Sequence, residues 1–210
     1  PVVTVITEGA FHRDPLYNML QIRDVQVSAH VKCIATAEEV KEKSVEELDA
    51  LLAESFSFDN FAWQRDNSIS IDVPFRADGL HRILYKCPHC KEENQMLGKG
   101  IHLTCKACGK SWEMNKYGQL IACDGESEYS HLPDWYNWQR DCVRQEFLDD
   151  NYELELPVSI GILTDYKGLY MVGDGTLYHD KNGFRLEGCD GKLEYTQGPT
   201  HSYSLNSLNV

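Results

Sequence analysis

Residues 86–109 read KCPHCKEENQMLGKGIHLTCKACG and carry four cysteines in two C-x-x-C pairs. Cys87 and Cys90 form the first pair, and Cys105 and Cys108 form the second after fourteen intervening residues. Each pair can form a tight knuckle, and the residues between the pairs suit a β-hairpin. Four thiolates give the closed tetrahedral shell typical of a structural zinc ion, which leaves no coordination position open for water or substrate. The spacing therefore predicts a small zinc ribbon with these four cysteines as the metal ligands.

Other interpretations of the cysteines are weaker, although iron bound as in rubredoxin stays open. Iron–sulfur clusters usually follow different ligand spacings, and disulfides would require an exported protein. His89 lies between two cysteines that are already committed, so it is interpreted as a spacer. The remaining cysteines have no paired spacing and are interpreted as small core residues; they are Cys33, Cys123, Cys142 and Cys189.

The composition is that of an ordinary soluble domain or pair of domains. The 210 residues are 42% hydrophobic and 25% charged, and no apolar run reaches the roughly 18 residues of a membrane-spanning helix. No secretory signal pattern opens the chain. Paired cysteines without such a signal favour the reducing cytoplasm. Because residues 1–6 (PVVTVI) already lie inside a strand pattern, we expect the chain to be a piece of a longer one.

The net charge of −13 disfavours a nucleic-acid or anionic-membrane partner, since both would be repelled. Residues 82–122 are locally different, with seven basic and three acidic side chains. A zinc ion with four thiolates adds −2, which leaves about +2 there. Trp112 and Tyr117 could stack on bases, but a small ribbon also needs them as its core. A nucleic-acid-binding ribbon is therefore the least favoured hypothesis.

The first 84 residues predict strands and helices in alternation. Residues 2–8 and 24–34 have strand patterns. Thr36 with Glu39, and Ser44 with Glu47, have the spacing of capping boxes, and the second opens a helix through residue 56. A short helix is expected over 58–67, followed by an extended segment over 68–84.

The last part of the chain predicts one helix and an antiparallel meander. A helix is expected from Pro133 to about 150, with Trp135, Trp138, Cys142 and Phe147 facing inward. Short strands follow from about residue 152, the last of them at 201–205 (HSYSL). Three dipeptides favour tight hairpin turns between them; these are Asp174-Gly175, Asn182-Gly183 and Asp190-Gly191.

Several stretches resemble a known family. PVVTVITEGAF, HRDPLYN and RDVQVSAHVKCIATAEEVKEKSVEEL are similar to the last part of the glycerophospholipid acyltransferase fold. In that family a P-V-V-x-V strand, a Gly-aromatic turn and a second strand precede a helix containing E-E-L or S-V-E-E-L. FRADGLHRILYKCPHC, KGIHLTCKACGKSWEMNKYGQL and SHLPDWYNWQRDCVRQEF resemble the extension of certain bacterial 1-acylglycerol-3-phosphate acyltransferase-like proteins.

The resemblance implies an α+β organisation in four parts. Residues 1–80 would be the end of the acyltransferase-like α/β domain, 81–125 the zinc ribbon, 126–151 a linking helix and 152–210 an antiparallel β module. The family's His-x4-Asp motif and its Pro-Glu-Gly-x-Arg-like phosphate-binding segment are both missing from the chain. We therefore predict no catalytic residue and no cofactor-binding residue besides the zinc ligands, and leave open whether the chain belongs to an enzyme.

The predicted function is that of a non-catalytic C-terminal region in such a protein. The parent would transfer an acyl group from acyl-CoA or another acyl thioester to a lysophospholipid through an N-terminal catalytic domain. The present chain would brace that domain or bind a partner. That implies a cytoplasmic location, or a peripheral one at the inner membrane through the parent. The alternative is a stand-alone module that binds a protein through the ribbon and the aromatic side chains of Trp135, Tyr136 and Trp138. Exposure of these three rings would support that alternative.

Overall fold

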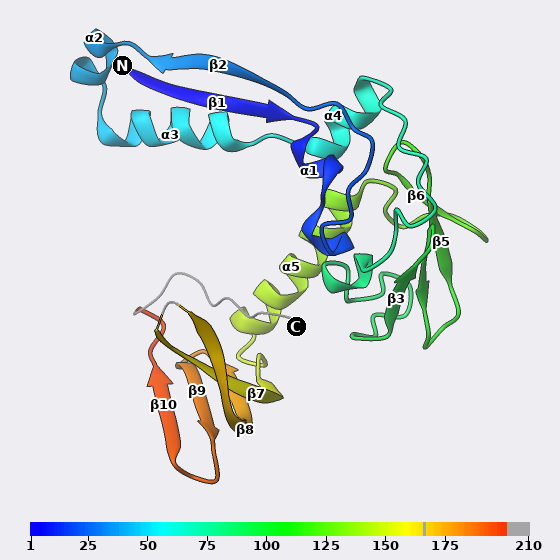
Figure 1. The fold of residues 1–210 in the computed structure, drawn as a ribbon, viewed down its shortest axis with the longest axis vertical. Coiled ribbons are helices and arrows are strands. Elements are labelled where there is room, and N and C mark those ends of the chain that lie inside the picture. The colour runs from blue at the N-terminus through cyan, green and yellow to red at the C-terminus, as the bar shows by residue number, and fades with distance from the viewer. Residues whose placement is uncertain (166, 201–210) are drawn as a thin grey trace. The chain divides into compact units, whose positions relative to one another are not determined.

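The computed structural model describes residues 1–165 and 167–200 and separates into two compact units, residues 1–139 and 140–210. We call them the N-terminal and the C-terminal unit. Helices and three antiparallel sheets make up the described residues, in the orders β1-β2, β3-β4-β5-β6 and β10-β9-β8-β7 (Figure 1). The predicted α+β class is thus confirmed. The finer division at residues 80, 125 and 151 stays a prediction.

The N-terminal unit begins with two paired strands. β1 (Val2–Glu8) runs antiparallel to β2 (Ser28–Ala35), with Val5 opposite Val31. The short helices α1 (Ala10–Arg13) and η1 (Leu16–Asn18) lie between them. β2 begins four residues later than predicted. The reason is that Arg23 and Val25 are buried in the loop before it, at 2% and 4% exposure, and so are not free to join the strand.

Three helices follow, and both predicted capping boxes are confirmed. α2 (Ala37–Glu42) starts after Thr36 and α3 (Val45–Phe56) after Ser44, each with the reciprocal bonds to Glu39 or Glu47. α4 (Asn60–Asp66) is capped by the Asp59 carboxylate. The extended segment expected over 68–84 is wrong in its second half. Residues 74–79 turn and η2 (Leu80–Arg82) follows, because Leu80 and Leu84 are both drawn into the core at 0% exposure.

The ribbon has four very short strands. They are β3 (Met96–Lys99), β4 (His102–Cys105), β5 (Ser111–Met114) and β6 (Leu120–Ala122). The first part of α5 (Leu132–Leu148) packs against them. Buried side chains from these elements, from η1, α4 and η2 and from the loops around η2 form one core: Tyr17, Phe61, Ala77, Leu80, Leu84, Cys87, Met96, Leu103, Cys105, Trp112, Met114, Leu120, Leu132 and Trp135. The ribbon is therefore the centre of the N-terminal unit.

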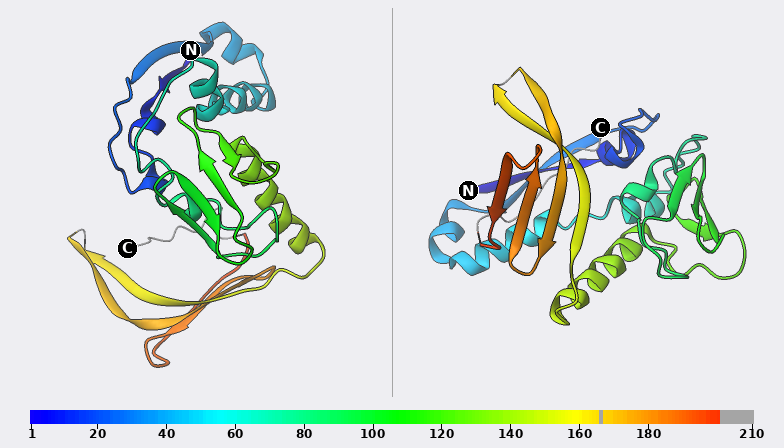
Figure 2. Two further views of the ribbon diagram at one scale, coloured as in Figure 1. Left: turned by 90° about the vertical axis from the view of Figure 1, so that its right-hand side faces the viewer. Right: turned by 90° about the horizontal axis from the view of Figure 1, so that it is seen from below.

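The C-terminal unit contains the end of α5 and the predicted antiparallel meander. Its strands are β7 (Leu154–Asp165), β8 (Gly168–Asp180), β9 (Gly183–Gly188) and β10 (Leu193–Gln197). The long β7–β8 pair curves along its length (Figure 2). Asn182-Gly183 lies at the β8–β9 turn and Asp190-Gly191 at the β9–β10 turn, as predicted. The strand predicted at 201–205 lies outside the described residues.

The turn predicted at Asp174-Gly175 is wrong, because both residues lie inside β8. Gly175 faces Val158 on β7 and Gly188 on β9, and a side chain there would collide with the backbone oxygen of Glu187. The glycine thus allows three strands to approach closely, a second role of glycine in strands besides turn formation. Among the described residues, no helix is both long and apolar enough to cross a bilayer.

Candidate metal centre

Two tight turns carry the four cysteines, as the spacing predicts. The first knuckle follows η2 along the chain. It is closed by a β-bridge between Lys86 and Glu93 and by the hydrogen bond that the Lys91 amide donates to the Cys87 carbonyl. The second begins at the end of β4, where the Gly109 amide donates to the Cys105 carbonyl. The pairing of β3 with β4 places Met96 opposite Cys105, which brings the two knuckles together.

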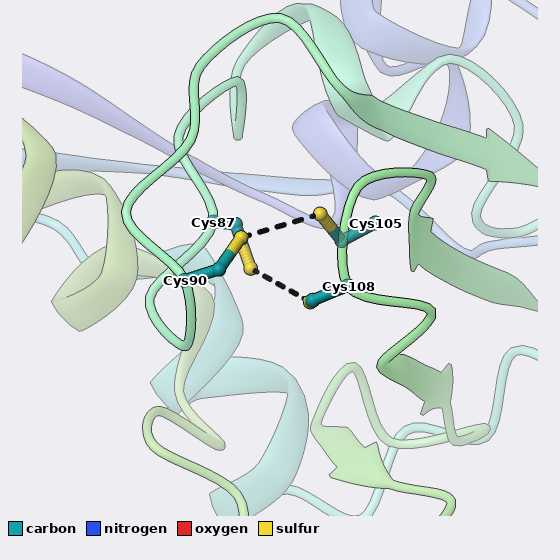
Figure 3. Close-up of side chains that lie close together, drawn as sticks. All are labelled: Cys87, Cys90, Cys105 and Cys108. Carbon is teal, nitrogen blue, oxygen red and sulfur yellow. Dashed lines mark hydrogen bonds between the residues drawn. The ribbon is translucent and has the colours of Figure 1, made fainter.

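The four sulfur atoms form a compact cluster (Figure 3). The Sγ atoms of Cys87 and Cys108 lie 3.9 Å apart, and those of Cys90 and Cys105 lie 3.7 Å apart. All four lie within 4.8 Å of one another. A tetrahedron with metal–sulfur bonds of about 2.3 Å has edges of about 3.8 Å, so the cluster matches the size of a four-thiolate metal site. The residues present therefore fit a metal ion.

Burial and hydrogen bonds from backbone amides shift the pKa values of the cysteine thiols in opposite directions. Burial raises the pKa of Cys87 to about 12 although the amides of Cys90 and His89 donate to its sulfur. Burial also raises the pKa of Cys108. At Cys105 burial acts in the same direction, but hydrogen bonds from the Cys108 and Ala107 amides, together with those to the Cys108 and Cys90 thiols, lower the pKa. A metal binds thiolates, so binding at this site releases protons and weakens as the pH falls.

Left-handed backbone conformations close both knuckles. Gly109, which follows the second pair of cysteines, has φ 78°, a conformation that glycine adopts without strain. Lys91 occupies the equivalent position in the first knuckle with φ 69°, a conformation disfavoured for a residue with a side chain. Its Nζ donates to the Pro88 carbonyl at 2.6 Å and lies 4.7 Å from the centre of the Trp138 ring. These contacts offset the cost of the left-handed conformation at Lys91.

Positive and negative side chains surround the cluster. Lys110 contacts the Glu128 carboxylate at 2.6 Å, and His89 Nδ1 contacts the same carboxylate oxygen at 3.1 Å. His89 points to this carboxylate and stands outside the sulfur cluster, in agreement with its interpretation as a spacer. Lys91 directly follows Cys90, and Lys110 lies two residues after Cys108. Both are close in sequence to thiolates that would carry a net −2 with a divalent ion.

Two clamping residues on α5 were not anticipated from the sequence. Trp135 Nε1 donates to the Lys86 carbonyl at 3.0 Å, and Gln139 Nε2 donates to the Ile83 carbonyl at 2.5 Å. Both side chains are buried, at 0% and 1% exposure. Their i, i+4 spacing puts them on one helix face, which is the signal that could have identified them. They hold the chain that enters the first knuckle.

The other cysteines and aromatic rings depart in part from expectation. Cys33 and Cys123 are exposed, so their interpretation as core residues is wrong; Cys142 and Cys189 are half-buried. Cys33 lies on the uncovered face of the β1–β2 pair, and Cys123 follows the short final strand of the ribbon. Phe147 is 37% exposed and stacks on Tyr152 at 4.2 Å.

Burial also decides between the roles proposed for the aromatic residues. Trp112 and Trp135 have 0% exposure and meet edge to face at 4.9 Å, so neither is available to bases or to a protein partner. Trp138 is partly buried against the same core, and Tyr136 is 41% exposed. The rings expected to dock a partner therefore serve mostly as core.

Comparison with known proteins adds no precedent for this arrangement: no protein-family model, curated protein or solved structure matches the chain. The chemistry of the site follows from its own donor set. Four sulfurs around one ion complete a tetrahedral shell and leave no position for a reacting molecule. Such a centre can hold two chain segments together but is not arranged for catalysis.

Proposed function

We propose that Cys87, Cys90, Cys105 and Cys108 hold one structural zinc ion, and that the chain is the non-catalytic C-terminal region of a glycerophospholipid acyltransferase-like protein. The observation that carries the first part is the sulfur cluster of tetrahedral size at the edge of the core, where Cys87 and Cys105 are at 0% exposure, Cys90 is half-buried and Cys108 is exposed. Zinc favours this closed four-thiolate shell, and the same sulfurs also suit iron.

The ion would be a condition of folding for the N-terminal unit. The ribbon strands have only three or four residues each, and Cys87 and Cys105 belong to the same core as Trp112 and Trp135. Structural zinc contributes roughly 10–16 kcal/mol to the folding of small domains at neutral pH. The metal would therefore organise the core that the clamping residues Trp135 and Gln139 complete.

The acyltransferase assignment is supported by the resemblance of residues 1–18, 23–48, 75–90, 99–120 and 130–147. The non-catalytic role is supported by the missing His-x4-Asp and phosphate-binding motifs. The parent would bind the acyl thioester and the lysophospholipid through its N-terminal catalytic domain, which the present chain would brace. The protein would work in the cytoplasm or peripherally at the inner membrane.

Metal analysis tests the first part. Purified chain is expected to contain about one zinc and little iron per molecule. A content well below one metal per chain would contradict the site, and one iron with the absorption of ferric thiolates would replace zinc by iron.

Activity tests the second part. The full-length parent, supplied with acyl-CoA and lysophosphatidate, should form phosphatidate, whereas the isolated chain should not. Turnover by the isolated chain would contradict the non-catalytic role, and an inert parent would contradict the acyltransferase assignment.

A further inference from the structure

The four cysteines of the metal centre differ in their exposure to solvent. Cys87 and Cys105 are at 0% exposure, Cys90 is half-buried, and Cys108 is exposed. The susceptibility of a thiolate to oxidation follows its accessibility. A reagent from solvent therefore reaches Cys108 more readily than it reaches the other three ligands.

The residues that follow the two knuckles account for part of this difference. Lys91 follows the first pair of cysteines, and its Nζ folds back to the Pro88 carbonyl at 2.6 Å and over the Trp138 ring. Gly109 has the equivalent position after the second pair. Apart from its chain neighbours, no described atom lies within 4 Å of the position that a Cβ would take there. A side chain is thus folded against the first knuckle, whereas the second is open beside Cys108.

The short sulfur–sulfur contacts of the cluster run from one knuckle to the other (Figure 3). Cys108 Sγ lies 3.9 Å from Cys87 Sγ, and Cys90 Sγ lies 3.7 Å from Cys105 Sγ. A disulfide bond is roughly 2.0 Å long, so an approach of about 2 Å would join Cys87 and Cys108. An accessible thiolate with a second thiol in reach is the arrangement found in cysteines that respond to oxidants.

We propose that Cys108 is the site at which a hydroperoxide oxidises the metal centre, and that the product is a Cys87–Cys108 disulfide with release of the ion. The inference rests on the proposed function for the presence of a zinc ion held by thiolates. It makes the structural centre sensitive to oxidants, although the centre takes no part in catalysis.

The reaction with hydrogen peroxide balances in two steps. The Cys108 thiolate attacks one peroxide oxygen, so that an S–O bond forms, the O–O bond breaks and hydroxide leaves; the product is a sulfenic acid. The Cys87 thiolate then attacks the Cys108 sulfur, so that the S–S bond forms, the S–O bond breaks and a second hydroxide leaves. The two sulfurs lose two electrons to the peroxide, and both hydroxides take protons from the solvent. Two of the four ligands of the ion are then lost.

The position of this disulfide has a structural consequence. The bond joins the same two knuckles that the ion joins, so the chain stays closed between residues 87 and 108 after the ion has left. A disulfide within one knuckle would leave the two knuckles separate. Disulfides are reversible, unlike the higher oxidation products of cysteine. Reduction and fresh zinc should therefore restore the centre.

Zinc release and disulfide mapping test the proposal together. The zinc-loaded chain is treated with hydrogen peroxide beside a colorimetric zinc chelator, and its disulfides are located by peptide mass spectrometry. Release should approach about one zinc per chain and should parallel the formation of the Cys87–Cys108 disulfide. Dithiothreitol followed by zinc should return the tryptophan emission to that of the starting chain.

Matched variants identify the reacting thiol. Cys108→His keeps a fourth metal ligand, as in sites with three cysteines and one histidine, and should slow peroxide-driven release by roughly tenfold or more. Cys90→His makes the same exchange in the first knuckle and should still form the Cys87–Cys108 disulfide. Cys123→Ser removes an exposed thiol outside the cluster and should leave the release rate unchanged. If a histidine variant holds no zinc, the disulfide map of the unsubstituted chain still decides.

The outcomes separate this inference from the proposed function. A chain that keeps its zinc in peroxide while Cys123 is oxidised overturns the inference and leaves the structural zinc site intact. Release that yields a disulfide within one knuckle also overturns it, and so does release from Cys108→His at the unsubstituted rate. A chain that binds no zinc contradicts the proposed site and this inference with it.

Discussion

The described part of the chain contains two four-stranded antiparallel sheets, and the smaller one has the better core. The ribbon strands β3–β6 have three or four residues each, yet Leu103, Trp112 and Leu120 on them are all at 0% exposure. In the β7–β10 sheet, with strands of up to thirteen residues, Ile160 is the one large apolar side chain that is buried among the described residues. The length of the paired strands therefore does not determine how deeply their side chains are buried. The elements that pack against the faces of the sheet determine it.

The difference has a physical cause in each sheet. The ribbon is held between two knuckles and the first part of α5, so that two of the clustered cysteines and two tryptophans fill its interior. In the β7–β10 sheet, paired rows such as Leu156, Leu177, Leu186 and Tyr195 share one face by register. Leu156 and Tyr195 in that row remain 42% and 53% exposed.

Removing the metal should produce the largest contrast. Chelation, or Cys105→Ser, should unfold the ribbon, since the site's contribution to folding is on the order of 10 kcal/mol. The β7–β10 sheet belongs to a separate compact unit and should keep its hydrogen-exchange protection. All four tryptophans lie in the N-terminal unit, so their fluorescence follows that unit alone. An unchanged tryptophan spectrum after complete metal loss would show that the metal does not hold the core.

A matched pair of core truncations should give the next largest contrast. Leu103→Ala in β4 removes a side chain of 0% exposure and should lower the free energy of unfolding by about 2–5 kcal/mol. Leu156→Ala in β7 removes one that is 42% exposed and should lower it by less than about 1 kcal/mol. Hydrogen exchange in each unit measures both. Similar losses would mean that the face of the β7–β10 sheet is more deeply packed than its exposure indicates.

The sequence predicted those features correctly that depend on residues close together in the chain. The knuckle spacing, both capping boxes and the turns at Asn182-Gly183 and Asp190-Gly191 depend on residues a few positions apart, and the structure contains all of them. The turn predicted at Asp174-Gly175 was wrong because Gly175 is needed for close packing against β7 and β9, which are distant in sequence. Exposure of Cys33 could not be predicted either, since it depends on what covers the β1–β2 pair. The clamp by Trp135 and Gln139 likewise required knowing which carbonyls α5 meets.

The smallest expected effect is a pH dependence confined to the C-terminal unit. His179 stacks on Phe184 at 3.8 Å, and its Nδ1 lies 3.0 Å from the Tyr152 hydroxyl. Burial lowers the pKa of His179 below its ordinary value of 6.5, against the opposing charge of Asp180. The unfolded chain therefore binds this proton more readily, so stability should fall as the pH drops below 6.5 and level off once the folded-state pKa is passed.

Substitution at His179 isolates this effect from the titration of the carboxylates. His179→Gln should flatten the difference in β8–β9 hydrogen exchange between pH 7 and 5 relative to the unsubstituted chain, and a proton NMR titration should place the His179 pKa below 6.5. The thiolates of the ribbon also lose metal at low pH, but that loss belongs to the N-terminal unit. A His179 pKa at or above 6.5 would mean that the ring is solvated, and that even the best-packed aromatic residues of this sheet do not exclude water.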